Sequence, residues 1–218
     1  MKRSSLTLPA LGFLAALTAA ADARTKFTVG DFAVDADIMA NGLNHPWGMD
    51  FLPGGDVIVT ERSGTLRLLT SERLSEPVDG VPKVWARGQG GLLDVAAAPD
   101  FERSGLIFLS FSQPGNGGAG TAVARARLVK EGSKARLEDV EVIFAMEKKT
   151  SRGQHFGSRL VMRPDGTLFV TTGDRGDGKR AQDMNDSAGA VLRINTDGSA
   201  PGDNPYANGG ALPQLWSK

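Results

Sequence analysis

The sequence predicts an all-β fold, and three observations support this prediction. The apolar runs are short and rich in β-branched residues and phenylalanine. The 28 glycines and 11 prolines cluster mostly between these runs, where they mark turns. After the N-terminal segment, no stretch shows the sustained periodicity of an amphipathic helix. We therefore expect many short strands joined by turns.

The N-terminal residues 1–23 are expected to be a secretory signal peptide. A basic start at residues 2–3 precedes an apolar stretch over 6–21, and residues 21–23 offer a small-residue cleavage site. The apolar stretch is short for a membrane span, which needs about 20 residues. Residues 24–218 contain no second run of spanning length. We expect an exported, periplasmic protein whose mature chain does not span a membrane.

Composition argues against several kinds of partner. The full chain carries 25 basic and 25 acidic residues, and loss of the signal peptide would leave 23 and 24. A chain without excess positive charge or a basic block is poorly suited to bind nucleic acid or an anionic membrane. The chain has no cysteine, which excludes disulfides and thiolate metal sites. The core must therefore hold by packing alone.

The expected strands combine β-branched or aromatic residues with either strict alternation or a short apolar run. Two of them flank a turn at Ser63-Gly64, and two flank a glycine-rich loop at 115–120. In chain order, they are 57–60, 66–69, 106–111, 121–128, 140–144, 168–172 and 190–194.

The glycine-rich loop at 115–120 matches the pattern G-x-G-x-x-G of dinucleotide-binding sites. Such a site requires a helix next, whose N-terminus receives the pyrophosphate. An alternating strand follows here, so we interpret the segment as a hairpin loop. The chain also lacks the G-x-S-x-G, P-loop and H-E-x-x-H motifs of serine hydrolases, nucleotide triphosphatases and zinc proteases.

A weak internal repeat indicates sheets stacked around an axis. The stretches 47–59, 91–108 and 157–170 each read as glycine, short strand, proline-containing turn and second strand. Their prolines lie 46 and 65 residues apart. A propeller blade takes about 40–50 residues, so the second interval implies an insertion. The repeat predicts a β-propeller, of which this chain supplies about three to four blades.

The repeat also places candidate site residues. The segments 44–46, 87–89 and 153–155 each precede a repeat, so we expect them to meet at one mouth of the central channel. Convergent polar groups in a concavity indicate a binding or active site. Gln89 and His155 should therefore share that mouth.

His155 is the leading catalytic candidate. It lies among polar residues and glycines, and a neutral imidazole can accept a proton from a substrate hydroxyl. The alternative is a loop histidine bonded to backbone. His45 precedes Pro46, which favours extended backbone, and we interpret it as structural. Gln89 lies among three glycines, which either allow close approach to a ligand or simply form a turn.

The stretch from Asp174 to Asp186 is rich in carboxylates and amides. Ca²⁺ takes six to eight oxygen ligands, so this stretch is a candidate for calcium. It lacks the spacing and terminal glutamate of an EF-hand, and a solvated loop is the preferred interpretation.

Several motifs follow one another in a fixed order and together resemble a known family, the soluble PQQ-dependent sugar dehydrogenases (glucose/sorbosone or aldose sugar dehydrogenases). The resemblance covers roughly Ile38 to Ser217. Its motifs are Leu43 with His45–Gly48, Val59–Arg62, Gly88–Val95, His155–Leu160, Thr172–Arg175, Ala181–Asp183 and Asp203–Tyr206.

The resemblance implies a six-bladed propeller that oxidises an aldose at C1 with pyrroloquinoline quinone (PQQ), Ca²⁺ and an external electron acceptor. His155 would be the general base, taking the proton of the C1 hydroxyl as hydride passes to the quinone. Gln89 would contact cofactor and sugar. Gln154 stands where the glucose enzyme has an acid that helps to hold the sugar, which implies a different sugar preference.

The family pattern continues beyond Lys218 with a Gly-His-Arg-Asn-Pro stretch and the calcium ligands, so no metal ligand is assigned in this sequence. We expect this polypeptide alone neither to bind PQQ nor to oxidise sugar. Two alternatives remain open. One is a non-catalytic propeller fragment that binds carbohydrate or serves as a scaffold, and the other is a calcium-dependent lactonase-type hydrolase.

Overall fold

The computed structural model describes residues 25–71, 73–132 and 134–218. The expected signal peptide lies outside these residues. The chain divides into two compact units, the first ending at Met39 and the second running from Ala40 to Lys218. Within the first, β1 (Thr25–Val29) and β2 (Phe32–Ala36) form an antiparallel hairpin. In the described part of the chain, no helix is long and apolar enough to cross a membrane.

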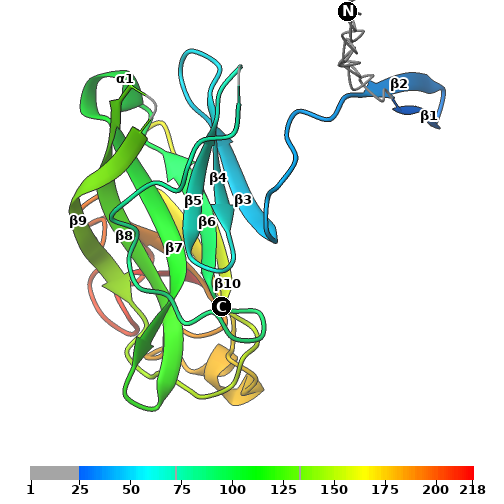
Figure 1. Ribbon diagram of the computed structural model, residues 1–218. Coiled ribbons are helices and arrows are strands. Elements are labelled where there is room, and N and C mark those ends of the chain that lie inside the picture. The colour runs from blue at the N-terminus through cyan, green and yellow to red at the C-terminus, as the bar shows by residue number, and fades with distance from the viewer. Residues whose placement is uncertain (1–24, 72, 133) are drawn as a thin grey trace, which may run out of the picture. The chain divides into compact units, whose positions relative to one another are not determined.

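The second unit consists of three antiparallel sheets in which successive strands are hydrogen-bonded neighbours (Figure 1). The first sheet contains β3 (Pro46–Phe51), β4 (Val57–Glu61) and β5 (Thr65–Leu69). The second contains β6 (Leu92–Ala97), β7 (Leu106–Gly115), β8 (Gly118–Glu131) and β9 (Lys134–Ala145). The third contains β10 (Gly157–Met162), β11 (Leu168–Thr172), β12 (Ala190–Ile194) and β13 (Leu215–Ser217). A short helix α1 (Phe101–Ser104) and the 3₁₀ turn η1 (Gly178–Gln182) connect strands. The all-β prediction is confirmed.

All seven segments expected to be strands lie within strands of the structure. The glycine-rich loop is the β7–β8 hairpin, where Gly115 pairs with Gly118, so its interpretation as a hairpin is confirmed.

The first sheet is extended irregularly rather than by a fourth strand, since the Ser75 and Val78 N–H groups donate to β5 carbonyl oxygens at 2.7 and 2.9 Å. Each sheet is therefore a simple meander.

The three sheets are consecutive blades of a propeller. Their first strands lie side by side, with β6 between β3 and β10. Each of these inner strands also shifts register against its neighbour at the same place. The shifts fall after the pairs that Pro46, Leu92 and Gly157 make with the second strand of their own blade. This shared irregularity confirms the internal repeat and gives three blades.

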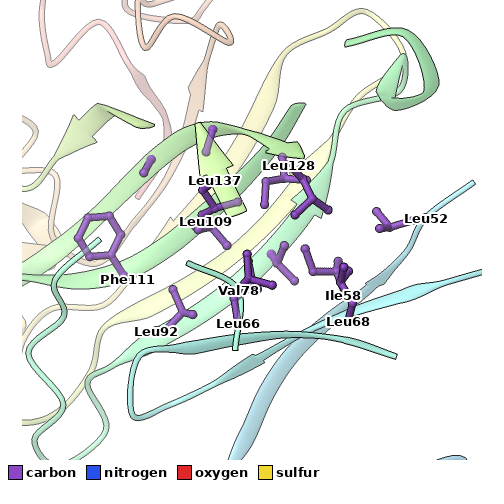
Figure 2. Close-up of a cluster of buried hydrophobic side chains, with 14 of the residues drawn as sticks. Leu52, Ile58, Leu66, Leu68, Val78, Leu92, Leu109, Phe111, Leu128 and Leu137 are labelled. Carbon is purple, nitrogen blue, oxygen red and sulfur yellow. The ribbon is translucent and has the colours of Figure 1, made fainter. Parts of the chain in front are cut away.

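The hydrophobic core lies between blades. One cluster joins the first blade to the second (Figure 2). In it, Ile58 and Leu66 pack in the same cluster as Leu109 and Leu128. A second cluster joins the second and third blades through residues such as Phe108 and Val170. These two interfaces fix the order and spacing of the inner strands, and therefore the positions of the loops that precede them.

Candidate functional site

His155 and Gln89 lie together at the ends of neighbouring blades. The backbone N–H of His155 donates to Gln89 Oε1 at 2.8 Å, and the Gln89 N–H donates to the Gly153 carbonyl at 2.7 Å. The segments before β6 and β10 are thus joined by hydrogen bonds, as the repeat predicts. Both side chains are exposed. Hollows of about 580 and 480 Å³ lie elsewhere, lined by other residues.

The imidazole of His155 is held by a carboxylate. Nδ1 lies 2.7 Å from Oδ1 of Asp174, the second residue after β11, and the side chain of His155 is 50% exposed. An ionised carboxylate can only accept, so this contact requires the proton on Nδ1. In the neutral ring the lone pair of Nε2 is then free for proton acceptance.

The charge of Asp174 suits it to accept the hydrogen bond from His155 Nδ1. Its Oδ1 also accepts the Gly176 N–H at 2.7 Å. The pKa of Asp174 is lowered, chiefly by the hydrogen bond from the His155 ring and next by the Gly176 N–H. The carboxylate therefore stays ionised across the neutral range, and it stabilises positive charge on the imidazole.

Gln154 is exposed beside His155. A Cβ at Gly176 would lie 2.9 Å from its amide nitrogen, so the Gln154 side chain lies close over that glycine. This places a second amide near the Gly176 turn, whose N–H donates to the carboxylate that holds His155. Its role toward a sugar stays a prediction.

His45 lies just before the inner strand of the first blade, where the repeat register matches it to Phe156, and the expected extended backbone is wrong. Its φ is 52°, close to the 55° of His155. The physical reason is the hydrogen bond that closes this end of the blade, in which the His45 carbonyl accepts the Arg62 N–H at 3.1 Å, as the Phe156 carbonyl accepts the Gly173 N–H in the third blade. The ring contacts Asn44 Oδ1 at 2.5 Å. The Glu61 carboxylate instead accepts the Asn44 N–H at 2.6 Å. These contacts fit the structural interpretation of His45.

The oxygen-rich stretch 174–186 uses its carboxylates within the protein. Asp174 holds His155, Asp183 accepts the Asn185 N–H at 2.9 Å, and Asp186 receives Arg180 Nε at 2.7 Å. Across residues 25–71, 73–132 and 134–218, no three His, Cys, Asp or Glu side chains gather to hold a metal ion. We assign no calcium ligand among these residues.

Two residues at the site were not singled out from the sequence, Asp174 as the partner of His155 and the buried Arg175. The internal repeat holds no signal for either. Its register matches Glu61 to Thr172 and Arg62 to Gly173, so Asp174 and Arg175 lie beyond the matched strands.

Comparisons with known proteins identify the family of this chain. The glucose/sorbosone dehydrogenase family matches residues 43–218. Aldose sugar dehydrogenase YliI of Escherichia coli (strain K12) is 42% identical over 188 residues, covering 84% of this chain and 50% of that protein.

Solved structures give the same result. The soluble aldose sugar dehydrogenase of Escherichia coli in its apo form has a TM-score of 0.76 at 42% identity, covering 82% of this chain and 52% of that one. The PQQ-bound aldose sugar dehydrogenase of Streptomyces coelicolor has a TM-score of 0.70 at 29% identity, covering 79% and 51%. This chain spans about half the length of these relatives. Sequence and fold together show that it belongs to the glucose/sorbosone dehydrogenase family.

Proposed function

We propose that this chain carries the general base of a PQQ-dependent aldose dehydrogenase, with His155 as that base. The observation that supports it is the contact of His155 Nδ1 with Asp174, beside Gln89, at one end of two neighbouring blades. The relatives are sugar dehydrogenases, and one of them binds PQQ. We further propose export, an aldose substrate and an external electron acceptor.

The residues present fit one edge of a flat, anionic quinone. His155, Gln89 and Gln154 offer an imidazole and two amides, all exposed. Two guanidinium groups lie at the same end, since Arg62 donates to the Gly88 carbonyl and Arg152 to the Gly176 carbonyl. Cations and amide donors suit carboxylates and quinone oxygens. The described residues do not fit a calcium ion, and calcium stays an expectation from the family.

The chemistry of this chain's residues follows from their geometry. PQQ, when bound, supplies a two-electron acceptor for the hydride that leaves C1 of the sugar. His155 Nε2 accepts the proton of the C1 hydroxyl, so the sugar loses one hydride and one proton and becomes a lactone. Asp174 keeps the Nδ1 proton in place and stabilises the imidazolium. Gln89 Oε1 fixes the His155 backbone, which leaves its amide NH₂ free for sugar or cofactor.

The first experiment tests the chain alone. The purified polypeptide is mixed with PQQ and Ca²⁺, and dye reduction is followed with glucose as substrate. We propose that no dye is reduced, because the chain spans about half of its relatives. Turnover in this assay would overturn that part of the proposal.

The second experiment tests the base. Residues 40–218 are joined to the remaining part of the Escherichia coli relative, and PQQ-dependent aldose oxidation is measured. We expect His155→Gln to lower kcat about 10²–10⁴-fold, the usual contribution of a general base. The other histidine variant, His45→Gln in the first blade, should retain activity. A chimera in which His155→Gln retains full activity would exclude His155 as the base.

The same assays separate the alternatives. Sugar binding by the chain without PQQ-dependent turnover by the chimera would favour a carbohydrate-binding or scaffold module. Lactone hydrolysis that needs Ca²⁺ and not PQQ would favour the hydrolase.

A further inference from the structure

We propose that Arg175 is a positioning residue for His155, and that its buried guanidinium holds the backbone just before that histidine and packs on the Phe156 ring just after it. The proposal rests on the proposed role of His155 as the base. It adds a residue that contacts neither the ring nor the sugar. Arg175 acts by keeping the ring of His155 against Asp174.

The contacts of Arg175 surround His155 in sequence. Nη1 donates to the Gln154 carbonyl and Nη2 donates to the Arg152 carbonyl. The guanidinium carbon lies 3.4 Å from the centroid of the Phe156 ring. The backbone N–H of Arg175 donates to the His155 carbonyl at 3.3 Å. One residue therefore fixes the chain before, at and after the histidine.

The local backbone needs such support. His155 and Arg175 have φ values of 55° and 58°, a region that residues other than glycine rarely adopt. Such conformations persist only where the surroundings hold them. The neighbouring elements leave no room to shift, because a Cβ at Gly173 would overlap the His155 carbonyl oxygen. The clamp and this close approach both restrain the corner.

The burial of Arg175 shows that its side chain faces these backbone carbonyls and not solvent. The residue is 0% exposed, and burial lowers the pKa of its guanidinium to about 10. Within the described residues, its side chain donates to the backbone carbonyls of Gln154 and Arg152 rather than to a carboxylate, and Nε has no partner. A buried arginine without a carboxylate is costly unless its donors are used. A planar fork reaches two carbonyls at once, which a lysine ammonium does not reproduce.

A second arginine provides a comparison. The Arg62 N–H also donates to a histidine carbonyl, that of His45, at 3.1 Å, although the repeat register matches Arg62 to Gly173. Its guanidinium donates to the Gly88 carbonyl of the next blade. Arg62 is therefore the control for an arginine that bonds a histidine carbonyl through its backbone N–H alone.

The test follows the two histidine rings by NMR. The full chain is labelled with ¹⁵N-histidine, and its two histidines give two sets of ring signals. Asp174→Ala, which removes the acceptor, defines the change expected when the Nδ1 contact is lost. We expect Arg175→Gln to move the His155 ring ¹⁵N signals in the same direction while the His45 signals stay fixed. Arg62→Gln should leave His155 unchanged. Urea unfolding of each variant separates loss of stability from loss of position.

The outcomes decide the proposal. If Arg175→Gln unfolds more easily but keeps wild-type His155 ring signals, Arg175 serves stability alone and the proposal is wrong. If Arg175→Gln does not fold, Arg175→Lys, which keeps the charge but not the fork, is measured in the same way. Wild-type His155 signals in Arg175→Lys would also overturn the clamp. The readout needs no cofactor or sugar, so an active His155→Gln chimera would refute the proposed function separately.

Discussion

At His155 the backbone defines the site as much as the ring does. The His155 N–H donates to Gln89, and its carbonyl accepts from the Arg175 N–H. Its φ of 55° turns the ring toward Asp174. A histidine in extended backbone would present its ring elsewhere. The chemistry proposed for Nε2 therefore depends on residues that never touch it.

The contact between His155 and Asp174 should give a specific pH dependence of stability. The pKa of Asp174 is lowered on folding, chiefly by the His155 hydrogen bond. Its contribution is therefore fully present above the ordinary value of 3.8 and is lost as pH falls through the lower folded value. We expect wild type to exceed Asp174→Asn in unfolding free energy from pH 5 to 7, and the difference to shrink below about pH 4. Urea unfolding across pH checks this, and a difference that persists unchanged at pH 2 would contradict it.

At the scale of the element, the bulged stretches of the inner strands link the blades. Asp94 of β6 is 1% exposed, and its Oδ2 accepts the Leu160 N–H of β10 at 2.8 Å. Its Oδ1 receives Arg159 Nη1 at 2.9 Å. On the other side lies Gly48 of β3, where a Cβ would be 2.5 Å from Asp94 Oδ1. One carboxylate thus contacts both neighbouring blades.

Asp94→Ala should therefore lower the unfolding free energy of the propeller more than an alanine substitution at an exposed neighbouring residue would. It leaves the buried Leu160 N–H without a partner, which costs about 1–3 kcal/mol. Burial raises the pKa of Asp94, so its charge is disfavoured in the folded state, and Asp94→Asn, which keeps one acceptor, should cost less. Urea unfolding of both variants checks the order. Equal losses of unfolding free energy in the two variants would show that the hydrogen-bond acceptor does not account for the destabilisation.

The junction after β11 should be intolerant of a single methyl group. A Cβ at Gly173 would overlap the His155 carbonyl oxygen, so Gly173→Ala forces the two segments apart and costs about 1–3 kcal/mol. Gly178, in the following 3₁₀ turn, has nothing within 4 Å of an added Cβ. Gly178→Ala should be neutral or stabilise by up to about 1 kcal/mol. Thermal unfolding of the pair tests this, and a Gly173→Ala variant as stable as Gly178→Ala would contradict it.

Strand alternation and turn residues were sufficient to predict most elements, because they report local burial. The three-residue β13 carries too short a pattern, and the half-exposed start of β9 at Lys134 lacks apolar alternation. The backbone of His45 was predicted wrongly, since the preference imposed by Pro46 is weaker than the hydrogen bond that the His45 carbonyl accepts from the Arg62 N–H. Arg175 gave no signal, because a loop arginine is ordinarily exposed and only the packing of Phe156 against it reveals its burial. The meeting of Gln89 with His155 could be predicted, because the repeat fixes which loops are equivalent.

At the scale of the whole second unit, stability comes from faces packed between blades. The middle blade packs on both sides, through one cluster with the first blade and another with the third. The outer faces of the first and third blades carry exposed apolar residues. Met49 and Phe51 of β3 are 55% and 67% exposed, and Val161 of β10 is 51% exposed. Apolar groups of this kind on a sheet face favour association.

These faces should make the chain associate with itself, and charge on them should prevent it. Phe51 pairs with Val57, which pairs with Leu69, and Val161 pairs with Phe169, so each exposed residue sits in an apolar ladder. We expect the double variant Phe51→Lys/Val161→Lys to bind less of an apolar dye and to sediment as a smaller species than wild type. Its unfolding free energy should change by less than about 0.5 kcal/mol, since both side chains already contact water. Val142→Lys on β9, 43% exposed in wild type, is the control and should leave association unchanged. Wild-type chain that stays monomeric at high concentration and binds no dye would show that these faces do not drive association.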